Sequence, residues 1–333
     1  MPGPMMRALW VERPDGPFAA VGLPRPVPAA GQALVRIHAS GVNPLDAKIR
    51  AGAAPHARQP LPAILGMDLA GVVEETGPGV EGLVPGEEVY GLAGGVGGLQ
   101  GTLADYAAVD AALLARKPPN LSMREAAALP LVAITAWEGL VDRARVEAGQ
   151  TVLVQGGAGG VGHVAVQLAR ALGARVFATG RAANADVIRA LSAEPIDYES
   201  EPVEAYVARL TGGEGFDVVY DTAGGPALDA AFKAVKRHGH VVSCLGWGTH
   251  ALAPLSFKAA SYSGVFTLPP LLDGEGRERL GAILAETTKL VEAGRLRPRL
   301  DPRRFGLDQA TDAHAAMAAR TAAGKLVVSV RDD

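Results

Sequence analysis

The sequence of 333 residues contains a single cysteine, Cys244. One cysteine permits neither an intramolecular disulfide nor a four-cysteine structural zinc site. Cys244 lies within the apolar run 241–245, so we expect a buried structural thiol rather than a nucleophile.

An excess of basic charge and a long apolar run are also missing. The 32 Lys and Arg residues are balanced by 35 Asp and Glu residues, for a net charge of −3, which provides no basic field for nucleic acid or anionic membranes. No run approaches the roughly 20 apolar residues of a membrane-spanning helix, and residues 1–7 lack the apolar core of a signal peptide. We therefore expect a cytoplasmic protein with neither nucleic acid nor a membrane as partner.

The glycines, by contrast, form a motif. Residues 152–154 predict a buried strand, residues 161–172 repeat apolar side chains at helical spacing, and 175–179 predict a second strand. The pattern Gly157-x-Gly159-x-x-Gly162 in such a unit is typical of a dinucleotide site, where glycines allow a tight turn and close approach to a pyrophosphate. A glycine-rich loop without a ligand is the alternative. The residues expected at the cofactor phosphates are Gly157, Ala158, Gly159, Gly160, Val161 and Gly162.

The end of the second strand indicates which dinucleotide binds. NAD sites place an acid about 20 residues after the first glycine, at the ribose 2′-OH. Residues 179–181 contain no acid, and Asp186 comes too late. Arg181, next to Gly180, is suited to a 2′-phosphate, although a solvated surface arginine is the alternative. The sequence therefore favours NADPH.

The two halves of the chain have different patterns. Residues 1–117 predict a β-rich, barrel-like module with strands at 6–11, 33–38, 70–75, 88–90 and 103–109. A capping-box pattern at Ser122 and Glu125 predicts the start of a helix, and a second helix is expected at 135–143. Strands then alternate with helices, which predicts an α/β, doubly wound parallel sheet. Further strands are expected at 195–198, 216–220, 240–245 and 263–268, and further helices at 186–191, 201–210 and 226–235. The tail predicts helices at 278–293 and 307–319 and a closing strand at 324–330.

Four segments carry a family resemblance: Gly-Val-Asn-Pro-Leu-Asp at 41–46, Leu-Gly-Met-Asp-Leu-Ala-Gly-Val-Val at 65–73, the glycine motif, and Gly-Lys-Leu-Val-Val at 324–328. In this order they resemble the medium-chain dehydrogenase/reductase superfamily, in its zinc-independent quinone oxidoreductase branch. The resemblance implies a GroES-like catalytic domain (1–125), a Rossmann dinucleotide-binding domain (126–270) and a return segment (271–333) that completes the catalytic domain.

The resemblance also argues against catalytic zinc. Zinc alcohol dehydrogenases have a cysteine ligand in the segment like 41–46, and this sequence has none there. Where they have histidine followed by glutamate, this sequence has Met67 and Asp68. The nearest histidine pair, His238 and His240, is expected in a turn before a strand, in a structural role.

Without a metal, the resemblance implies hydride transfer from NADPH to a quinone or to the β-carbon of an α,β-unsaturated carbonyl. Asn43 and Asp46 would lie near the nicotinamide and substrate, with Asn43 in a positioning role; both could instead be turn residues. Lys48 is a candidate donor, although relatives often have tyrosine there. The substrate pocket would be formed by 43–54, 91–101 and 266–272.

The resemblance extends the predicted cofactor site to further positions. Tyr198 would join Arg181 at the 2′-phosphate, and Thr135 and Lys325 are candidates whose alternatives are a buried threonine and a surface lysine. The other implied contacts are Ala223 and Gly224 at the ribose, Gly246 and Trp247 at the phosphates, and Phe266, Thr267 and Leu268 at the nicotinamide. An edge strand at 263–268 would pair across a homodimer.

Two other functions stay open at this point. One is a reductase of trans-2-enoyl thioesters on the same scaffold. The other is a non-catalytic NADPH-binding protein with a sensing, RNA-binding or structural role.

Overall fold

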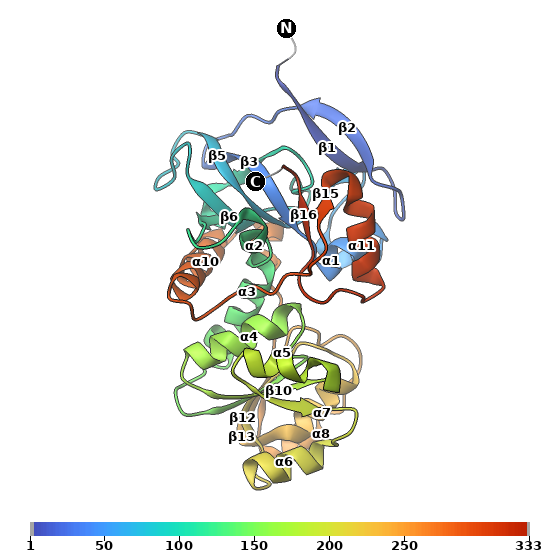
Figure 1. The fold of residues 1–333 in the computed structure, drawn as a ribbon, viewed down its shortest axis with the longest axis vertical. Helices are drawn as coiled ribbons and strands as arrows, with labels where there is room; N and C mark the ends of the chain where they lie inside the picture. The colour runs from blue at the N-terminus through green and yellow to red at the C-terminus, as the bar shows by residue number, and fades with distance from the viewer. Residues whose placement is uncertain (1–2, 332–333) are drawn as a thin grey trace. The chain divides into compact units, whose positions relative to one another are not determined.

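The computed structural model describes residues 3–331, which form two compact units (Figure 1). Unit 1 contains the described residues up to Leu131, the segment Leu268–Gly294 and the described residues from Pro298 onward. Unit 2 contains Val132–Thr267 and Arg295–Arg297.

Unit 1 is built on two largely antiparallel sheets. The three-stranded sheet has the order β2-β1-β4, with β1 Met5–Val11, β2 Ala19–Pro24 and β4 Ala63–Ile64. The seven-stranded sheet has the order β15-β16-β3-β5-β6-β8, and β7 also pairs with β3. Its strands are β3 Gln32–Gly41, β5 Asp68–Thr76, β6 Glu88–Leu92, β7 Tyr106–Asp110, β8 Leu114–Arg116, β15 Phe305–Gly306 and β16 Val327–Ser329. Gly71 permits the close pairing of β5 with β3, because a Cβ there would lie 2.3 Å from the Arg36 carbonyl oxygen.

The helices of unit 1 come from both ends of the chain. They are α1 Pro44–Arg50, α2 Met123–Ala127, α9 Pro269–Asp273, α10 Arg277–Glu292 and α11 Ala310–Ala318, with 3-10 turns η1 Pro55–Ala57, η2 Ala111–Leu113 and η5 Leu307–Gln309. The predicted capping box starts α2, where the Glu125 carboxylate accepts the Ser122 N–H at 2.9 Å. α11 packs against α1, and α10 packs on β8. The C-terminal helices therefore share a unit with the N-terminal strands.

Unit 2 contains a six-stranded parallel sheet of order β11-β10-β9-β12-β13-β14. Its strands are β9 Thr151–Gln155, β10 Arg175–Gly180, β11 Glu194–Asp197, β12 Phe216–Asp221, β13 Val235–Ser243 and β14 Ser261–Gly264. Its helices are α4 Gly160–Ala171, η4 Ala182–Asn184, α5 Ala185–Ala190, α6 Val203–Thr211, α7 Pro226–Ala234 and α8 Ala253–Lys258, preceded by α3 Pro130–Trp137 and the π-helix η3 Glu138–Arg143. The chain crosses from one side of β9 to the other, which makes the carboxyl end of β9 the switch point where ligands bind in such sheets.

The predicted doubly wound parallel sheet is confirmed, while several element boundaries are wrong. β13 begins at Val235, so His238 and His240 lie inside a strand and not in a turn before it; a φ of 59° at His238 accompanies a register shift in its pairing with β12. The strand predicted at 263–268 ends at Gly264. The sequence pattern missed β2 because its side chains are exposed or half-buried throughout, without a buried face.

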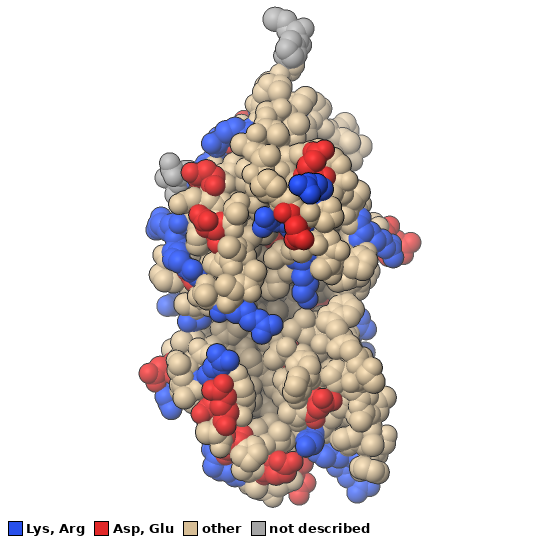
Figure 2. Space-filling view, turned by 90° about the vertical axis from the view of Figure 1, so that its right-hand side faces the viewer, with Lys and Arg blue, Asp and Glu red and all other residues tan. Residues whose placement is uncertain are grey.

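Two further features of the described chain are its helix lengths and its surface charge. No helix within residues 3–331 is both long and apolar enough to cross a membrane. On the face shown in Figure 2, acidic and basic side chains are interspersed. This face therefore reflects the near balance of 32 basic and 35 acidic residues.

Candidate functional site

The start of α1 in unit 1 holds two of the predicted catalytic residues. Asn43 is the N-cap of α1, and Pro44 opens the helix at a position where an N–H would have no helical partner. The Asp46 carboxylate accepts a hydrogen bond from the Asn43 backbone N–H at 2.8 Å, which is the returning half of a capping box. Both side chains are buried, at 0% and 1% exposure. They belong to a helix start and not to a simple turn.

The Asn43 side chain joins charged groups from distant segments. Its Nδ2 donates to Asp68 Oδ2 at 2.8 Å, and its Oδ1 accepts from Lys325 Nζ. Lys325 also donates to the Val42 carbonyl at 3.1 Å and lies 3.9 Å from Asp68 Oδ2. The other Asp68 oxygen accepts the Leu131 N–H at 2.9 Å. We refer to four side chains as the Asn43 cluster: Asn43, Asp46, Asp68 and Lys325.

Burial dominates the electrostatics of the Asn43 cluster. It raises the pKa of Asp46 to about 7, with repulsion from Asp68 adding to the effect. It raises the pKa of Asp68 to about 6 against the attraction of Lys325, whose own pKa burial lowers. Asp46 Oδ1 is buried and accepts no hydrogen bond from the described residues. The cluster therefore places a carboxyl group that titrates near neutral pH at the start of α1.

Lys48, the third predicted catalytic residue, lies on α1 outside the Asn43 cluster. Its side chain is exposed, whereas those of Asn43 and Asp46 are buried. The three predicted catalytic residues therefore differ in exposure. Asn43 and Asp46 are buried and held by hydrogen bonds, whereas the Lys48 amine is accessible to solvent. The roles of all three stay predictions.

The glycine motif in unit 2 forms the turn between β9 and α4. A Cβ at Gly157 would lie 2.5 Å from the Ala178 Cβ, and one at Gly162 would lie 2.0 Å from the Gly156 carbonyl oxygen. Thr179 of β10 holds the loop, because its Oγ1 accepts the Gly156 N–H at 3.1 Å and its carbonyl accepts the Gly157 N–H at 2.9 Å. The absence of side chains thus lets the loop pack tightly between strand and helix. The loop continues through Ala158, Gly159, Gly160 and Val161 into the N-terminus of α4, a favourable place for phosphate.

Arg181 and Tyr198 come together at one edge of the sheet. β10 and β11 pair in parallel with Gly180 opposite Asp197, and the Tyr198 N–H donates to the Gly180 carbonyl at 3.3 Å. Contacts with Tyr198, and secondarily with Glu199, raise the pKa of the Arg181 guanidinium. Arg181 Nε lies 3.1 Å from Glu199 Oε1. Glu199 was not among the predicted site residues, because an acid was expected only at the end of β10.

Asp221, at the end of β12, is a second residue of this region that was not predicted from the sequence. Its side chain is 0% exposed and its Oδ1 accepts the backbone N–H groups of Ala223 and Gly224 at 3.0 and 2.9 Å. Its Oδ2 accepts the Ser243 hydroxyl at 2.7 Å. Asp221 therefore fixes the turn that carries the two residues predicted at the ribose. The sequence signal that could have identified Asp221 is its place at the carboxyl end of a buried apolar strand.

The remaining predicted cofactor residues of unit 2 follow β13 and β14 or lie in α3. Trp247 and Phe266 meet edge to face, with ring centroids 6.4 Å apart. A Cβ at Gly246 would lie 2.2 Å from the Tyr262 hydroxyl. The Thr135 side chain is buried, and its carbonyl accepts the Tyr220 hydroxyl at 2.7 Å.

Two other predicted cofactor residues, Leu268 and Lys325, belong to unit 1, while Thr267 ends the main segment of unit 2. Leu268 is the buried N-cap of α9. Lys325 is 3% exposed and its amine is held by the Asn43 cluster. It is therefore a buried lysine, and the surface-lysine alternative is wrong.

Two of the three segments predicted to form the substrate pocket, 91–101 and 266–272, meet in unit 1 at Gly97 and Leu271, and the residues just after the first segment contact both. The Gly97 N–H donates to the Ala57 carbonyl at 2.9 Å, and a Cβ at Gly97 would lie 3.2 Å from the Leu271 carbonyl oxygen. Arg58 forms an ion pair with Asp273 at 3.0 Å. The short segment after α1 thus links the glycine-rich 91–101 loop to α9.

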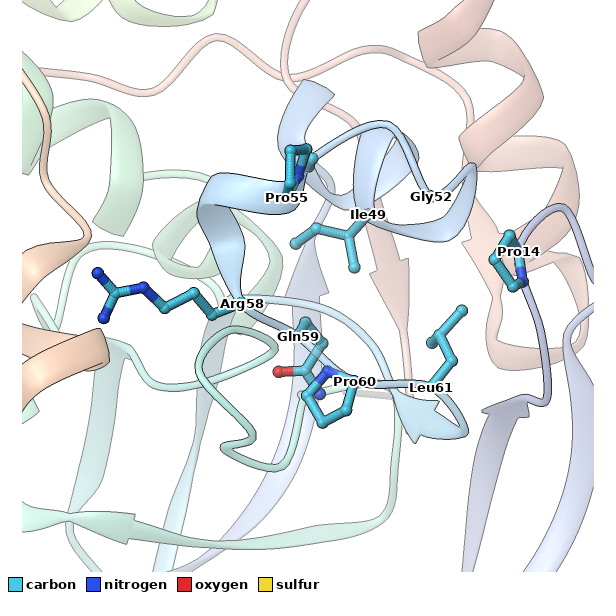
Figure 3. A pocket seen from close by; sticks show the side chains of 9 residues that line it. Pro14, Ile49, Gly52, Pro55, Arg58, Gln59, Pro60 and Leu61 are labelled. Atoms are coloured by element: carbon cyan, nitrogen blue, oxygen red, sulfur yellow. The ribbon is translucent and has the colours of Figure 1, made fainter.

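An open pocket of about 630 Å³ lies beside this segment (Figure 3). Ile49 of α1, Pro60 and Leu61 surround it, Pro14 lies beside Leu61, and the Arg58 side chain extends away from them. Its walls are mainly apolar, and its size is typical of small-molecule pockets, about 300–1,000 Å³.

Comparison with known proteins identifies the family. Residues 29–119 match the family model described as alcohol dehydrogenase GroES-like domain, and residues 192–328 match the model described as zinc-binding dehydrogenase. The chain is 37% identical over 305 residues to 2-methylene-furan-3-one reductase of Solanum lycopersicum, covering 89% of this chain and 71% of that protein. The chain belongs to the medium-chain dehydrogenase/reductase superfamily, in its quinone oxidoreductase-like branch.

Other relatives agree with this assignment. The NADPH-dependent alkenal/one oxidoreductase of Arabidopsis thaliana is 35% identical over an alignment that covers 89% of this chain and 72% of that protein. The crystal structure of an alcohol dehydrogenase superfamily protein from Novosphingobium aromaticivorans superimposes with a TM-score of 0.96 at 61% identity, covering 98% of this chain and 100% of that one. The spectinabilin polyketide synthase system protein NorB of Streptomyces orinoci is 38% identical over 303 residues, covering 91% of this chain, which spans only 13% of that protein.

The positions expected for zinc ligands in this medium-chain dehydrogenase/reductase are now placed in space. Met67 is fully buried, and Asp68 belongs to the Asn43 cluster. Within residues 3–331, no group of three or more His, Cys, Asp or Glu side chains is arranged to hold a metal ion. Cys244 follows the end of β13 and is half-buried, so the fully buried thiol expected from the sequence is wrong. Its Sγ contacts the Asp221 carbonyl at 3.8 Å, and desolvation raises the pKa of the thiol to about 12.

Proposed function

We propose that this chain is a metal-independent, NADPH-dependent oxidoreductase that reduces α,β-unsaturated carbonyl compounds or quinones. The observation that carries the proposal is the glycine loop at the switch point of the parallel sheet. Two relatives with high coverage are named as reductases of this chemistry, one of them NADPH-dependent. Family membership supports a nicotinamide cofactor in general.

The residues of unit 2 fit a dinucleotide. Gly157 and Gly162 are buried and have no room for side chains. Gly159 and Gly160 are exposed, so their backbone would be available to a pyrophosphate at the N-terminus of α4. Asp221 positions the Ala223–Gly224 turn for the ribose. Arg181 and Tyr198, on neighbouring strand ends, provide a guanidinium and a phenol for a 2′-phosphate. A bound nicotinamide would supply a hydride to the acceptor.

The residues of unit 1 contribute positioning and proton transfer. A conjugated acceptor moves negative charge onto its oxygen as hydride arrives, so hydrogen-bond donors suffice in place of a metal. The Asn43 cluster fixes the start of α1, and Lys48 projects from this helix into solvent-accessible space, where it can donate a proton. The predicted segments 43–54 and 91–101, with residues 268–272 of the third segment, would form the acceptor pocket.

A homodimer is part of the proposal. β14 is an edge of the sheet, and its side chains are mostly exposed. Pairing of two such edges would satisfy their backbone groups. Light scattering on the purified protein tests this point, and a monomer would contradict it.

Cofactor titration followed by turnover tests the proposed function. Fluorescence with NADPH and NADH measures affinity, and absorbance at 340 nm measures oxidation with 9,10-phenanthrenequinone or a simple enone. We expect tighter NADPH binding and turnover that survives a metal chelator. Binding without oxidation of any acceptor would contradict the enzymatic assignment.

A reductase of enoyl thioesters is the second candidate, because NorB, a polyketide synthase system protein, matches 91% of this chain at 38% identity. A trans-2-enoyl N-acetylcysteamine thioester in the same assay distinguishes the two. A kcat/KM higher for the thioester than for the matching enone would favour this second function.

A further inference from the structure

Glu199 is paired with the arginine to which the proposed function assigns a phosphate. Arg181 and Glu199 are 18 positions apart in the sequence (199 minus 181), and the parallel pairing of β10 with β11 brings them to one sheet edge. Arg181 Nε lies 3.1 Å from Glu199 Oε1, and the two side chains are 66% and 56% exposed. The Glu199 carboxylate therefore forms an ion pair with the Arg181 guanidinium, which is the group expected to bind a 2′-phosphate.

The position of Glu199 is set by its backbone and not by Arg181 alone. Asp197 Oδ1 accepts the Glu199 N–H at 3.2 Å, and Asp197 Oδ2 accepts the Ser200 hydroxyl at 2.7 Å. The Tyr198 N–H donates to the Gly180 carbonyl at 3.3 Å. These contacts make a fixed turn that presents Tyr198 and Glu199 together at the end of β10.

We propose that Glu199 is a specificity-determining residue that competes with the 2′-phosphate of NADPH for Arg181. In the cofactor-free protein its carboxylate neutralises the guanidinium, and NADPH binds only when Glu199 releases it. Glu199 thereby weakens NADPH binding and narrows the preference for NADPH over NADH. This inference rests on the proposed function, because it requires Arg181 to be the 2′-phosphate ligand.

The expected effect is modest and selective. An exposed ion pair is worth little, so its release changes an affinity by less than about 5-fold. Repulsion between the carboxylate and a phosphate a few ångströms away adds a factor of similar size at low salt. Removing the charge should therefore tighten NADPH binding by about 3- to 10-fold, while NADH, which has no 2′-phosphate, should change by less than about 2-fold.

The test is a set of binding titrations that need no turnover. Kd values for NADPH and NADH, and for the fragments 2′,5′-ADP and 5′-AMP, are measured at low salt for wild type, Glu199→Gln, Arg181→Met and the double variant. The matched control is Glu201→Gln, which removes the same charge two residues away, where Arg209 binds it at 2.8 Å. Arg181 and Glu199 are both exposed, so these variants should fold.

The proposal expects Glu199→Gln to tighten NADPH and 2′,5′-ADP selectively, with no such change in Glu201→Gln. It also expects the Glu199 effect to vanish in the Arg181→Met background. Unchanged NADPH affinity in Glu199→Gln would overturn it, as would weaker NADH binding, which would make Glu199 a ligand of the ribose 2′-OH instead. If Arg181→Met alone leaves NADPH affinity unchanged, the proposed 2′-phosphate site itself fails.

Discussion

Replacing Asp46 by asparagine should change the pH dependence of stability. The free energy of unfolding of the variant, compared with that of wild type, should be more favourable at pH 8 than at pH 5. Burial raises the pKa of Asp46 to about 7, from an ordinary value of 3.8. Between these values the folded chain binds more protons than the unfolded chain, so the free energy of unfolding falls as pH rises. The stability contributed by the protonated carboxyl is complete below about pH 4 and is lost as pH rises through about 7.

The magnitude follows from the pKa and can be isolated from the other effects of the substitution. Two pH units of this window, from 5 to 7, correspond to about 2.7 kcal/mol at 1.36 kcal/mol per unit. The new side-chain amide can still accept the Asn43 N–H, while its NH2 replaces the unpaired Oδ1 at a constant cost of about 1–3 kcal/mol. That cost cancels when the change in stability at pH 8 is compared with the change at pH 5. We expect a difference of about 2–3 kcal/mol in favour of the variant at pH 8.

Urea denaturation at pH 5, 6, 7 and 8, followed by tryptophan fluorescence, measures this difference through the midpoint and slope. The control is Asp186→Asn, the same chemical change at a side chain that is 98% exposed. Asp46→Asn and wild-type profiles that stay parallel within about 0.5 kcal/mol across this range would refute the reasoning.

Three further substitutions probe other parts of the structure. Gly162→Ala places a Cβ 2.0 Å from the Gly156 carbonyl oxygen. It should lower NADPH affinity at least about 10-fold and reduce the free energy of unfolding by about 1–3 kcal/mol. The control is Gly22→Ala, whose Cβ would meet only a methyl group at 3.8 Å, and it should change neither quantity in the same titrations. Asp221→Ala leaves two backbone N–H groups and a hydroxyl without their acceptor, so urea midpoints should show a loss of about 3 kcal/mol, and a loss under 1 kcal/mol would argue against its structural role. Lys325→Met removes the cation beside Asp68 and should destabilise the chain by about 3–5 kcal/mol at pH 8. The loss should be smaller at pH 5, because Asp68, with a pKa of about 6, is protonated there. An equal loss at both pH values would contradict the ion pairing.

Several features of this protein are determined locally and were predictable from the sequence. The strand, glycine loop and helix at 151–171 form one continuous unit whose periodicities and glycines are visible without a fold. The capping box at Ser122 and Glu125 needs only a spacing of three residues. The alternation of strands and helices predicted the parallel sheet of unit 2, because parallel strands need a crossover between them.

The Asn43 cluster and the pairing of Glu199 with Arg181 depend on the tertiary structure. Asn43 meets Asp68 and Lys325 across 25 and 282 residues, and only the order and register of β3, β5 and β16 bring them together. Glu199 reaches Arg181 because β11 pairs beside β10, a neighbour relation that spacing along the chain does not contain. The sequence determines which short segments form, since hydrogen bonding and side-chain period act over a few residues. Which charges share a buried site depends on strand order, and that is settled only when the sheets assemble.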